Sequence, residues 1–263
     1  SSVTAMYGMF QSAASFNGDL SSWNVSSVTD VEDMFNDAES FNQDISNWDV
    51  SNVTDIEGMF QNAESFNQDI SNWDVSSVTD MKQMFYQTDS FNVDISGWDV
   101  SNVTNMEGTF QSTGSFNQDI SDWDVSSVTA MYGMFQSATS FNQDISSWNV
   151  SSVTNMEYMF SGANALSDEN KCFIHSVFQS NDAWPYDWSN YCYTYVPDNN
   201  FEQALIDLGY DDTLDNYVLT ESISGVTSLD VEDKSISDLT GIEDFTALDT
   251  LGCGYNQLTS LDV

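Results

Sequence analysis

The 25 residues from Val53 to Ser77 read VTDIEGMFQNAESFNQDISNWDVSS, and close copies of this stretch run from residue 1 to about residue 165. Large aromatic residues recur at fixed phases of the period, and Phe60, Phe66 and Trp73 are their members in this copy. A fixed period in the twenties with large apolar residues at fixed phases is the signature of a solenoid. One unit is too small to bury its own apolar face, so the units are predicted to stack into one long core.

Each unit is predicted to begin with a short helix. Thr54 and Glu57 have the spacing of a capping box, and Ile56 and Phe60 lie four residues apart, on one helical stripe. These features predict a short helix or helical turn over about residues 55–62, on the convex side of the solenoid. So short a helix would be held by packing rather than by its own stability.

An extended segment follows, and we expect Phe66 and Ile70 to point to the same side of it. It predicts a short strand over about residues 68–71, paired in parallel with its neighbours. The predicted fold class is therefore an α/β repeat solenoid of the leucine-rich-repeat kind, with short parallel strands and short helices or turns on the convex side.

Two polar phases, represented here by Asn67 and Asp69, do not vary among the six full units. A ladder of amides and carboxylates can bind cations through oxygen, with calcium as the candidate ion. Alternatively, these side chains satisfy backbone groups at a turn that every coil needs. A second aspartate phase, that of Asp74, alternates between acid and amide, which favours turn chemistry.

The phases around this invariant aspartate are the candidate binding surface, because they would lie exposed on the strand face. The candidate residues are Gln43, Asp44, Gln68, Asp69, Asp94, Gln118, Asp119, Gln143 and Asp144.

The charge balance of the chain is extreme. There are 42 Asp and Glu residues against three lysines and no arginine, giving a formal charge of −39. Such a surface repels phosphate backbones, which excludes nucleic acid as a partner. It can attract cations or basic partners, or keep an exported protein soluble. No stretch approaches the roughly 20 apolar residues of a membrane span, so we expect no membrane insertion.

The 25-residue period fails after Ala163, and we divide the chain into a repeat array (1–166), an aromatic-rich cap (167–195) and a second array (196–263). Cys172 and Cys192 flank the cap and are predicted to form a disulfide. Closing a loop of this length stabilises a fold by about 3 kcal/mol, and a disulfide indicates an oxidising compartment outside the cytoplasm.

The second array is predicted to open with a capping helix over about residues 200–208. Asn199 is the expected N-cap and Gly209 the expected C-cap. The helical spacing predicts one buried face, formed by Phe201, Ala204, Leu205 and Leu208.

A 22-residue period follows, in which the stretch from Leu229 to Leu239 aligns with that from Leu251 to Leu261. It has the leucine-rich-repeat pattern, with Asn256 at the ladder position and Cys253 as a buried free thiol. The chain begins and ends within a repeat, so we expect it to be part of a longer protein whose targeting segments lie elsewhere.

An acidic cluster lies between the capping helix and this array. Its carboxylates are a candidate calcium site, although the glycine and the spacing of an EF-hand are missing. The candidate ligands are Asp211, Asp212 and Asp215.

The 25-residue unit resembles the repeat of bacterial surface proteins related to the BspA-like leucine-rich-repeat group, over residues 1–166. Residues 198–263 resemble the capped start of an internalin-like leucine-rich-repeat domain. Together these resemblances imply an exported or surface-anchored bacterial protein that adheres to a host or matrix. They carry no catalytic residues with them.

Three functions follow from these features. The first is an extracellular adhesion module that presents its repeat surface to a protein or glycan. The second is a spacer or stalk, stiffened by calcium, which the near-identity of the units favours. The third, catalysis, is disfavoured because the carboxylates repeat in register, whereas acid–base chemistry needs two that differ in environment.

Overall fold

The structure is a computed structural model that describes residues 3–259. It divides into two compact units, of which the first ends at Tyr186 and the second begins at Asp187. The division falls inside the segment 167–195, which was predicted to be one cap. No helix in the described part of the chain is long and apolar enough to cross a membrane.

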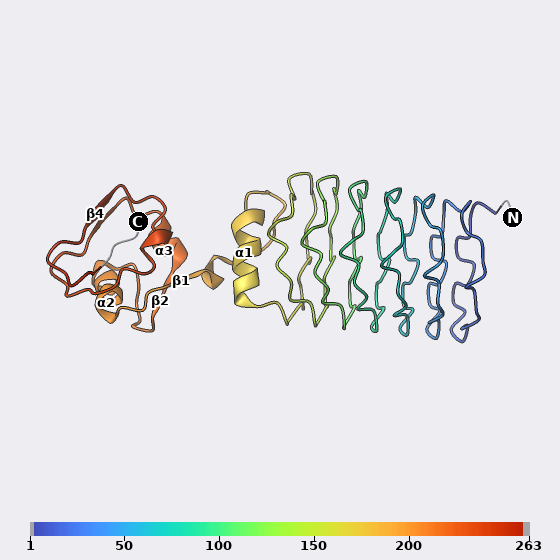
Figure 1. Cartoon of the computed structure of the whole chain (residues 1–263), viewed down its shortest axis with the longest axis horizontal. Coiled ribbons are helices and arrows are strands. Elements are labelled where there is room, and N and C mark those ends of the chain that lie inside the picture. Colours follow the sequence, from blue (N-terminus) through green and yellow to red (C-terminus); the bar gives the residue numbers. More distant parts are fainter. Residues whose placement is uncertain (1–2, 260–263) are drawn as a thin grey trace. The chain divides into compact units, whose positions relative to one another are not determined.

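In the first unit, consecutive 25-residue coils lie side by side (Figure 1). Parallel bridges join equivalent positions of neighbouring coils, from Ala5 through to Asn155. Alternate backbone N–H groups of each coil donate to the next coil. In the copy quoted above, each donor bonds to the carbonyl of the residue 24 positions further on, at N–O distances of 2.7–3.2 Å. The donors are Ile56, Gly58, Phe60 and Asn62.

The intervening N–H groups stay within their own coil. Those of Met59, Gln61 and Ala63 donate to the carbonyl of the residue three positions earlier, which makes a series of tight turns. Of the short helix or helical turn predicted over residues 55–62, the helix is wrong, and the segment is a series of turns. The strand predicted over 68–71 is wrong as well, because the hydrogen bonds between coils form along the turns and residues 68–71 take part in no strand pairing.

Two positions of every coil have left-handed backbone, at Gly58 (φ +58°) and Asn62 (φ +54°) in this copy. A residue with left-handed backbone lets successive N–H groups point alternately to the next coil and back into their own coil. A helix does not allow this alternation. Glycine adopts this conformation without the steric cost that a Cβ imposes. Three coils nevertheless carry another residue at the first of these positions, namely Asp33, Gln83 and Tyr158.

The core of the first unit is a stack of aromatic rings. Phe60 stacks on Phe66 of its own coil at 3.9 Å between ring centroids, and on Phe85 of the next coil at 5.9 Å. The indole N–H of Trp73 donates to the carbonyl of Ile45 in the preceding coil at 3.2 Å. The equivalent tryptophans of four other coils do the same, so they fill the core and also supply a hydrogen bond between coils; they are Trp48, Trp98, Trp123 and Trp148.

Helix α1 (Asp168–Phe178) and the segment after it close this core. The buried face of the helix is formed by Ile174, His175 and Phe178. Trp184 packs edge-on against Phe178 at 5.3 Å between centroids. The hydroxyl of Tyr186 accepts the backbone N–H of Phe160 at 2.9 Å, replacing the carbonyl that another coil would provide.

The predicted disulfide is present. Cys172 and Cys192 are disulfide-bonded, and of the three cysteines in the chain only Cys253 is free. The thiol of Cys253 is half-buried rather than buried as predicted, because among the described residues no further coil covers it.

The second unit contains short helices and two pairs of short strands (Figure 1). An antiparallel pair is formed by β1 (Tyr193–Tyr195) and β2 (Tyr217–Leu219), and a parallel pair by β3 (Ser228–Asp230) and β4 (Thr250–Gly252). The helical elements are η1 (Ser189–Tyr191), α2 (Asn199–Leu208), α3 (Thr220–Ser224) and η2 (Ile242–Asp244).

Helix α2 agrees with its prediction except at two residues. Its N-cap is Asp198 rather than Asn199, and Gly209 ends it in the left-handed conformation. Phe201, Ala204 and Leu205 are buried, but Leu208 is 47% exposed because it lies at the helix end, beyond the core.

The 22-residue offset is confirmed by the β3–β4 register, in which Leu229 pairs with Leu251. Asn256 lies at a ladder position, where its Oδ1 accepts the N–H groups of Lys234 and Ile236. The predicted partner Leu261 lies outside the described residues. The assignment of both units to one leucine-rich-repeat class stays a prediction, since most of the first unit consists of turns and extended chain.

We predict that Gly58→Ala lowers the free energy of unfolding by about 1–2 kcal/mol, since it places a Cβ on left-handed backbone. The new Cβ would also collide with Oδ1 of Asp33. At the equivalent position of the next coil, Gln83→Gly should raise the free energy of unfolding by up to about 1 kcal/mol. Urea denaturation of both variants measures the two effects, and equal signs would contradict this account of the turn.

A second prediction concerns Asp198, whose carboxylate joins two segments of the second unit. Its Oδ1 accepts the N–H groups of Asn200 and Phe201, while Oδ2 accepts the backbone N–H and hydroxyl of Ser237 and the N–H of Asp238. Burial pushes the pKa of this carboxyl up, but the hydrogen bonds outweigh it and hold the pKa below the ordinary value of 3.8.

A depressed pKa in the folded state means that the stabilisation is present above pH 3.8 and is lost as the pH falls through the folded value. Asp198→Asn should therefore cost about 1–2 kcal/mol at pH 7. The difference from the native chain should shrink at pH 3 and below, measured by denaturation at each pH. Asp249→Asn, at an exposed position, is the control, and a difference that does not change with pH would contradict the prediction.

Candidate functional site

The aspartates of the candidate binding surface lie exposed at a turn of each coil. Oδ1 of Asp69 accepts the backbone N–H of Ser71 at 3.0 Å and its hydroxyl at 2.7 Å. These bonds, the hydroxyl first, lower the pKa of Asp69. The same backbone bond from the serine two residues on recurs at Asp44, Asp94, Asp119 and Asp144. One oxygen of each aspartate thus holds the turn.

The predicted glutamines are engaged differently. Nε2 of Gln68 donates to Oδ1 of Asn42 in the preceding coil at 2.8 Å. The equivalent bonds are made by Gln43, Gln118 and Gln143. These side chains are half-buried and hold neighbouring coils together, which leaves the aspartates as the more accessible part of the predicted surface.

The invariant asparagines form a ladder that runs along the first unit. Oδ1 of Asn42 accepts the backbone N–H of Asn67 at 3.0 Å, and the pattern repeats from coil to coil. At its end, Oδ1 of Asn142 accepts the N–H of Ser167, the N-cap of α1, at 2.8 Å. The asparagines thus satisfy backbone groups, which was one of the two interpretations of their invariance.

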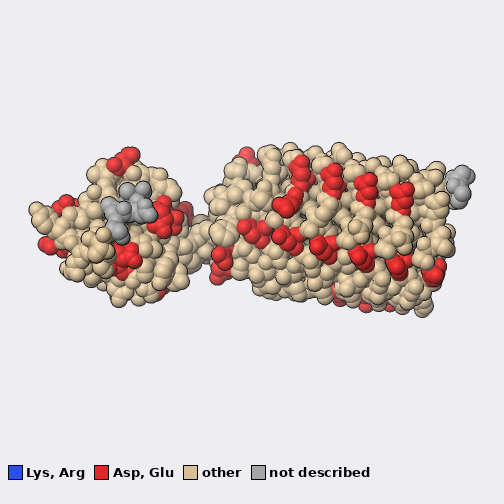
Figure 2. Space-filling model, in the orientation of Figure 1, with Lys and Arg blue, Asp and Glu red and all other residues tan. Residues whose placement is uncertain are grey.

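Acidic residues run in rows along the first unit, and no basic residue is visible among them on the face drawn (Figure 2). Stacking coils in register places like charges one coil apart. Burial raises the pKa of Asp55, and the neighbouring Asp80 and Asp30 raise it further. Lys82 relieves one row by pairing with Glu57 at 2.6 Å. The first unit is therefore an extended anionic surface with little internal compensation.

The predicted calcium ligands Asp211, Asp212 and Asp215 lie in the loop between α2 and β2. Glu202, which is fully buried in α2, holds this loop, because its Oε1 accepts the N–H groups of Asp215 and Asn216. Among residues 3–259, no three His, Cys, Asp or Glu side chains are grouped so that they could hold a metal ion. Calcium binding by this loop stays a prediction.

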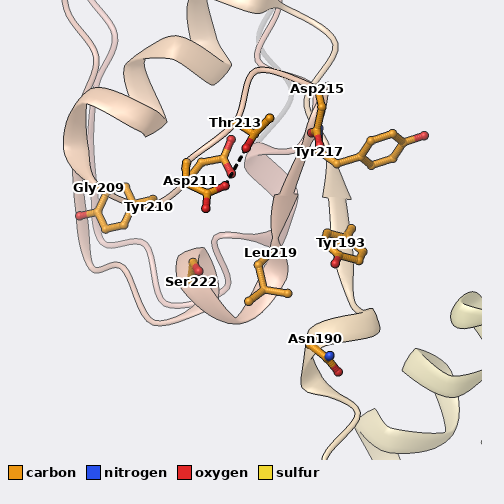
Figure 3. Close-up of a pocket in the computed structure, with 11 residues that line it drawn as sticks. Asn190, Tyr193, Gly209, Tyr210, Asp211, Thr213, Asp215, Tyr217, Leu219 and Ser222 are labelled. Atoms are coloured by element: carbon orange, nitrogen blue, oxygen red, sulfur yellow. Dashed lines mark hydrogen bonds between the residues drawn. The ribbon is translucent and has the colours of Figure 1, made fainter.

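The same loop borders a pocket of about 470 Å³ in the second unit (Figure 3). Its walls include the side chains of Tyr193, Leu219 and Ser222 opposite the acidic loop. Sequence reasoning identified the aspartates but not the tyrosine and the leucine. The alternation of Tyr193 and Tyr195 around a small residue could have indicated an exposed aromatic strand face.

The electrostatics of this pocket are dominated by its carboxylates. Burial raises the pKa of Asp211, and the charges of Asp215 and Asp212 act in the same direction. Oδ2 of Asp211 is buried without a hydrogen-bond partner among the described residues. No lysine, arginine or histidine lines the pocket. The pocket therefore has unused hydrogen-bond acceptors and negative charge.

Comparison with known proteins gives two findings. The family model described as "Mycoplasma protein of unknown function, DUF285" matches residues 1–96 and 67–173. Internalin J of Listeria monocytogenes serotype 4b (strain F2365) is 39% identical over 72 residues. That match covers 26% of this chain and 7% of internalin J, so the chain spans a small part of this relative's length.

The asparagine ladder generates a prediction about stability. Oδ1 of Asn92 accepts two donors, the N–H of Asn117 and the side-chain amide of Gln118. Oδ1 of Asn67 accepts the N–H of Asn92, and Val93 replaces the glutamine that would be the second donor. Asn92→Ala should lower the free energy of unfolding by about 1.5 kcal/mol and Asn67→Ala by about 1 kcal/mol. Urea denaturation measures both, and a larger loss for Asn67→Ala would refute this assignment.

Proposed function

This chain belongs to the family described as "Mycoplasma protein of unknown function, DUF285", and we propose that it is a non-catalytic bacterial surface module that binds a protein or glycan outside the cell. The proposal includes a leucine-rich-repeat-like solenoid in two tandem arrays and a relationship to the BspA-like group. The similarity to internalin J supports a protein of the bacterial surface. The disulfide between Cys172 and Cys192 supports a location outside the cytoplasm.

The observation that carries this proposal is the exposed row of Asp44, Asp69, Asp94, Asp119 and Asp144. Each carboxylate is fixed by its turn, so the row is rigid and regularly spaced. A preorganised row loses little conformational freedom on binding. Its charge favours a partner with basic groups, because complementary charge speeds association and selects the partner.

The similarity between coils supports the non-catalytic part of the proposal. Two carboxylates that divide the roles of acid and base need environments that separate their pKa values. Hydrogen bonds from the following serine lower the pKa values of Asp44, Asp69 and Asp94 in the same way. Such a row provides repeated contacts rather than one reaction centre.

The alternative function is a spacer or stalk, stiffened by calcium. The observation that favours it is the repetition of the same hydrogen bonds from coil to coil, including the bonds by which the glutamines of four coils hold neighbouring coils together. A surface that repeats itself sets length without selecting a partner. Under this alternative, unfolding temperature should rise with calcium and fall with chelator, because a ligand of the folded state stabilises it.

The test of adhesion removes charge from the row without changing its shape. The triple variant Asp69→Asn, Asp94→Asn and Asp119→Asn should weaken binding to immobilised basic extracellular proteins by about tenfold at 0.15 M salt, because several charge contacts are lost together. Surface plasmon resonance with the full chain measures this, and immobilised neutral oligosaccharides test the glycan class in parallel.

A matched control is available in the same coils. The same backbone bond from a serine two residues on is accepted by the aspartates of the second aspartate phase, which are also exposed; they are Asp74, Asp99 and Asp124. Their triple asparagine variant loses the same charge at a different turn and should bind almost as the native chain does. No saturable binding to either class of probe, or equal losses in both triple variants, would overturn the proposal in favour of the spacer.

A further inference from the structure

The antiparallel pair β1–β2 in the second unit exposes aromatic rings on one face. Thr194 and Val218 are buried on the inner side of the pair. On the outer side, Tyr193, Tyr195 and Tyr217 are each about half exposed, at 57%, 52% and 49%. Exposed tyrosines on adjacent strands give a rigid, amphipathic contact surface of the type enriched at binding sites.

The pocket of about 470 Å³ lies beside this face. Figure 3 shows Asp211 on the loop, Leu219 below it at the end of β2, and Tyr193 on the adjacent strand β1, and all three line the pocket. The ring of Tyr217 points away from the loop and packs instead near Tyr195, at 5.4 Å between centroids. The pocket thus has an apolar wall and an acidic wall, and the tyrosine face continues outside it.

The acidic wall has acceptor atoms that the chain itself does not use fully. Oδ1 of Asp212 accepts the hydroxyl of Thr213, and Oδ1 of Asp215 accepts the N–H of Tyr217. Oδ2 of Asp211 is buried and receives no hydrogen bond among the described residues. This oxygen adds negative charge beside the pocket, while a ligand would contact the accessible carboxylate oxygens, chiefly those of the exposed Asp212 and Asp215.

The acidic wall is also fixed in place before any ligand binds. The buried carboxylate of Glu202 accepts two backbone N–H groups of the loop. The only basic residue of the second unit, Lys234, pairs with Asp207 at 3.5 Å and does not line the pocket. The charge of the pocket is therefore left for a partner to neutralise.

We propose that this pocket binds a lysine or arginine side chain of a polypeptide partner. The aliphatic stem would lie against Leu219 and the ring of Tyr193, and the cationic end would lie at the carboxylates of the acidic wall. Long basic side chains combine an apolar stem with a charged end, which matches the two walls. Residues flanking the basic side chain would contact the outer tyrosine face.

A cation fits this pocket better than a neutral sugar, although both can stack on tyrosine. The sugar supplies donors to the aspartates but no charge, whereas arginine or lysine supplies both and removes repulsion between the carboxylates. The inference deepens the proposed function, because it names the chemistry of a partner at a second surface. It rests on the second unit, so it can succeed or fail independently of the aspartate row.

The test uses the full, isotope-labelled chain and blocked peptides of sequence Gly-Gly-X-Gly-Gly, in which X is arginine, lysine, citrulline or norleucine. Saturable NMR shift changes at the amides of Asp211, Thr213 and Leu219 are expected for arginine and lysine. Citrulline has the shape of arginine without its charge, and norleucine has the stem of lysine without its ammonium. Equal binding of citrulline or norleucine would overturn the proposal.

Two variants examine the two walls. Asp211→Asn should weaken the arginine peptide roughly fivefold, the effect of losing one charge contact of about 1 kcal/mol. Tyr193→Ala, at an exposed position, should weaken arginine, lysine and norleucine peptides alike, through the stem. Asp249→Asn, an exposed charge outside the pocket, should leave binding unchanged, and a melting curve of each variant checks folding.

Several outcomes separate this proposal from its competitors. Unchanged arginine binding in Asp211→Asn, or shifts at these amides with a neutral oligosaccharide and not with arginine, would overturn it. The triple variant at Asp69, Asp94 and Asp119 should bind the arginine peptide normally. Loss of pocket binding and loss of row binding are therefore distinguishable results.

Discussion

The first unit depends on one hydrogen-bonding constraint, which is that alternate N–H groups of each coil donate to the next coil. Residues with left-handed backbone, such as Gly58, turn the intervening N–H groups back into their own coil. All these donors are thereby satisfied without a helix or a long strand, as buried backbone groups require. The spacing between coils follows from this ladder, and the aromatic stack and the surface rows follow from the spacing.

Because the ladder fixes the coils in register, residues at the same phase of the repeat lie in a row along the first unit. The phenylalanines become a continuous stack, and the invariant asparagines become a ladder that ends on α1 at Ser167. The same register places carboxylates one coil apart, which costs free energy through repulsion. The carboxylates of the row that contains Asp69 are exposed, so water and salt screen much of this repulsion.

The two units use acidic residues in different ways. In the first, aspartates such as Asp69 hold a turn with one oxygen and remain exposed. In the second, the carboxylate of Asp198 accepts five hydrogen bonds, whereas Asp211 has a buried oxygen without a partner among the described residues. The high negative charge of the chain therefore does not predict which carboxylates are available, and only their hydrogen bonds distinguish structural from accessible ones.

The sequence alone determined the 25-residue period, the buried phases of Phe60 and Trp73, and the cysteine pair, because apolar periodicity and cysteine spacing are local signals. It failed at residues 55–62, where Ile56 and Phe60 have helical spacing but their N–H groups are bonded by the next coil. The second left-handed position of the coil leaves no clear signal in sequence, because it carries different residues in different coils, such as Asn62, Gln87 and Ser137. Only the tertiary structure placed the buried Glu202 against the loop and brought Tyr193, Leu219 and Asp211 to one pocket, because these residues lie on different elements and are brought together by packing alone.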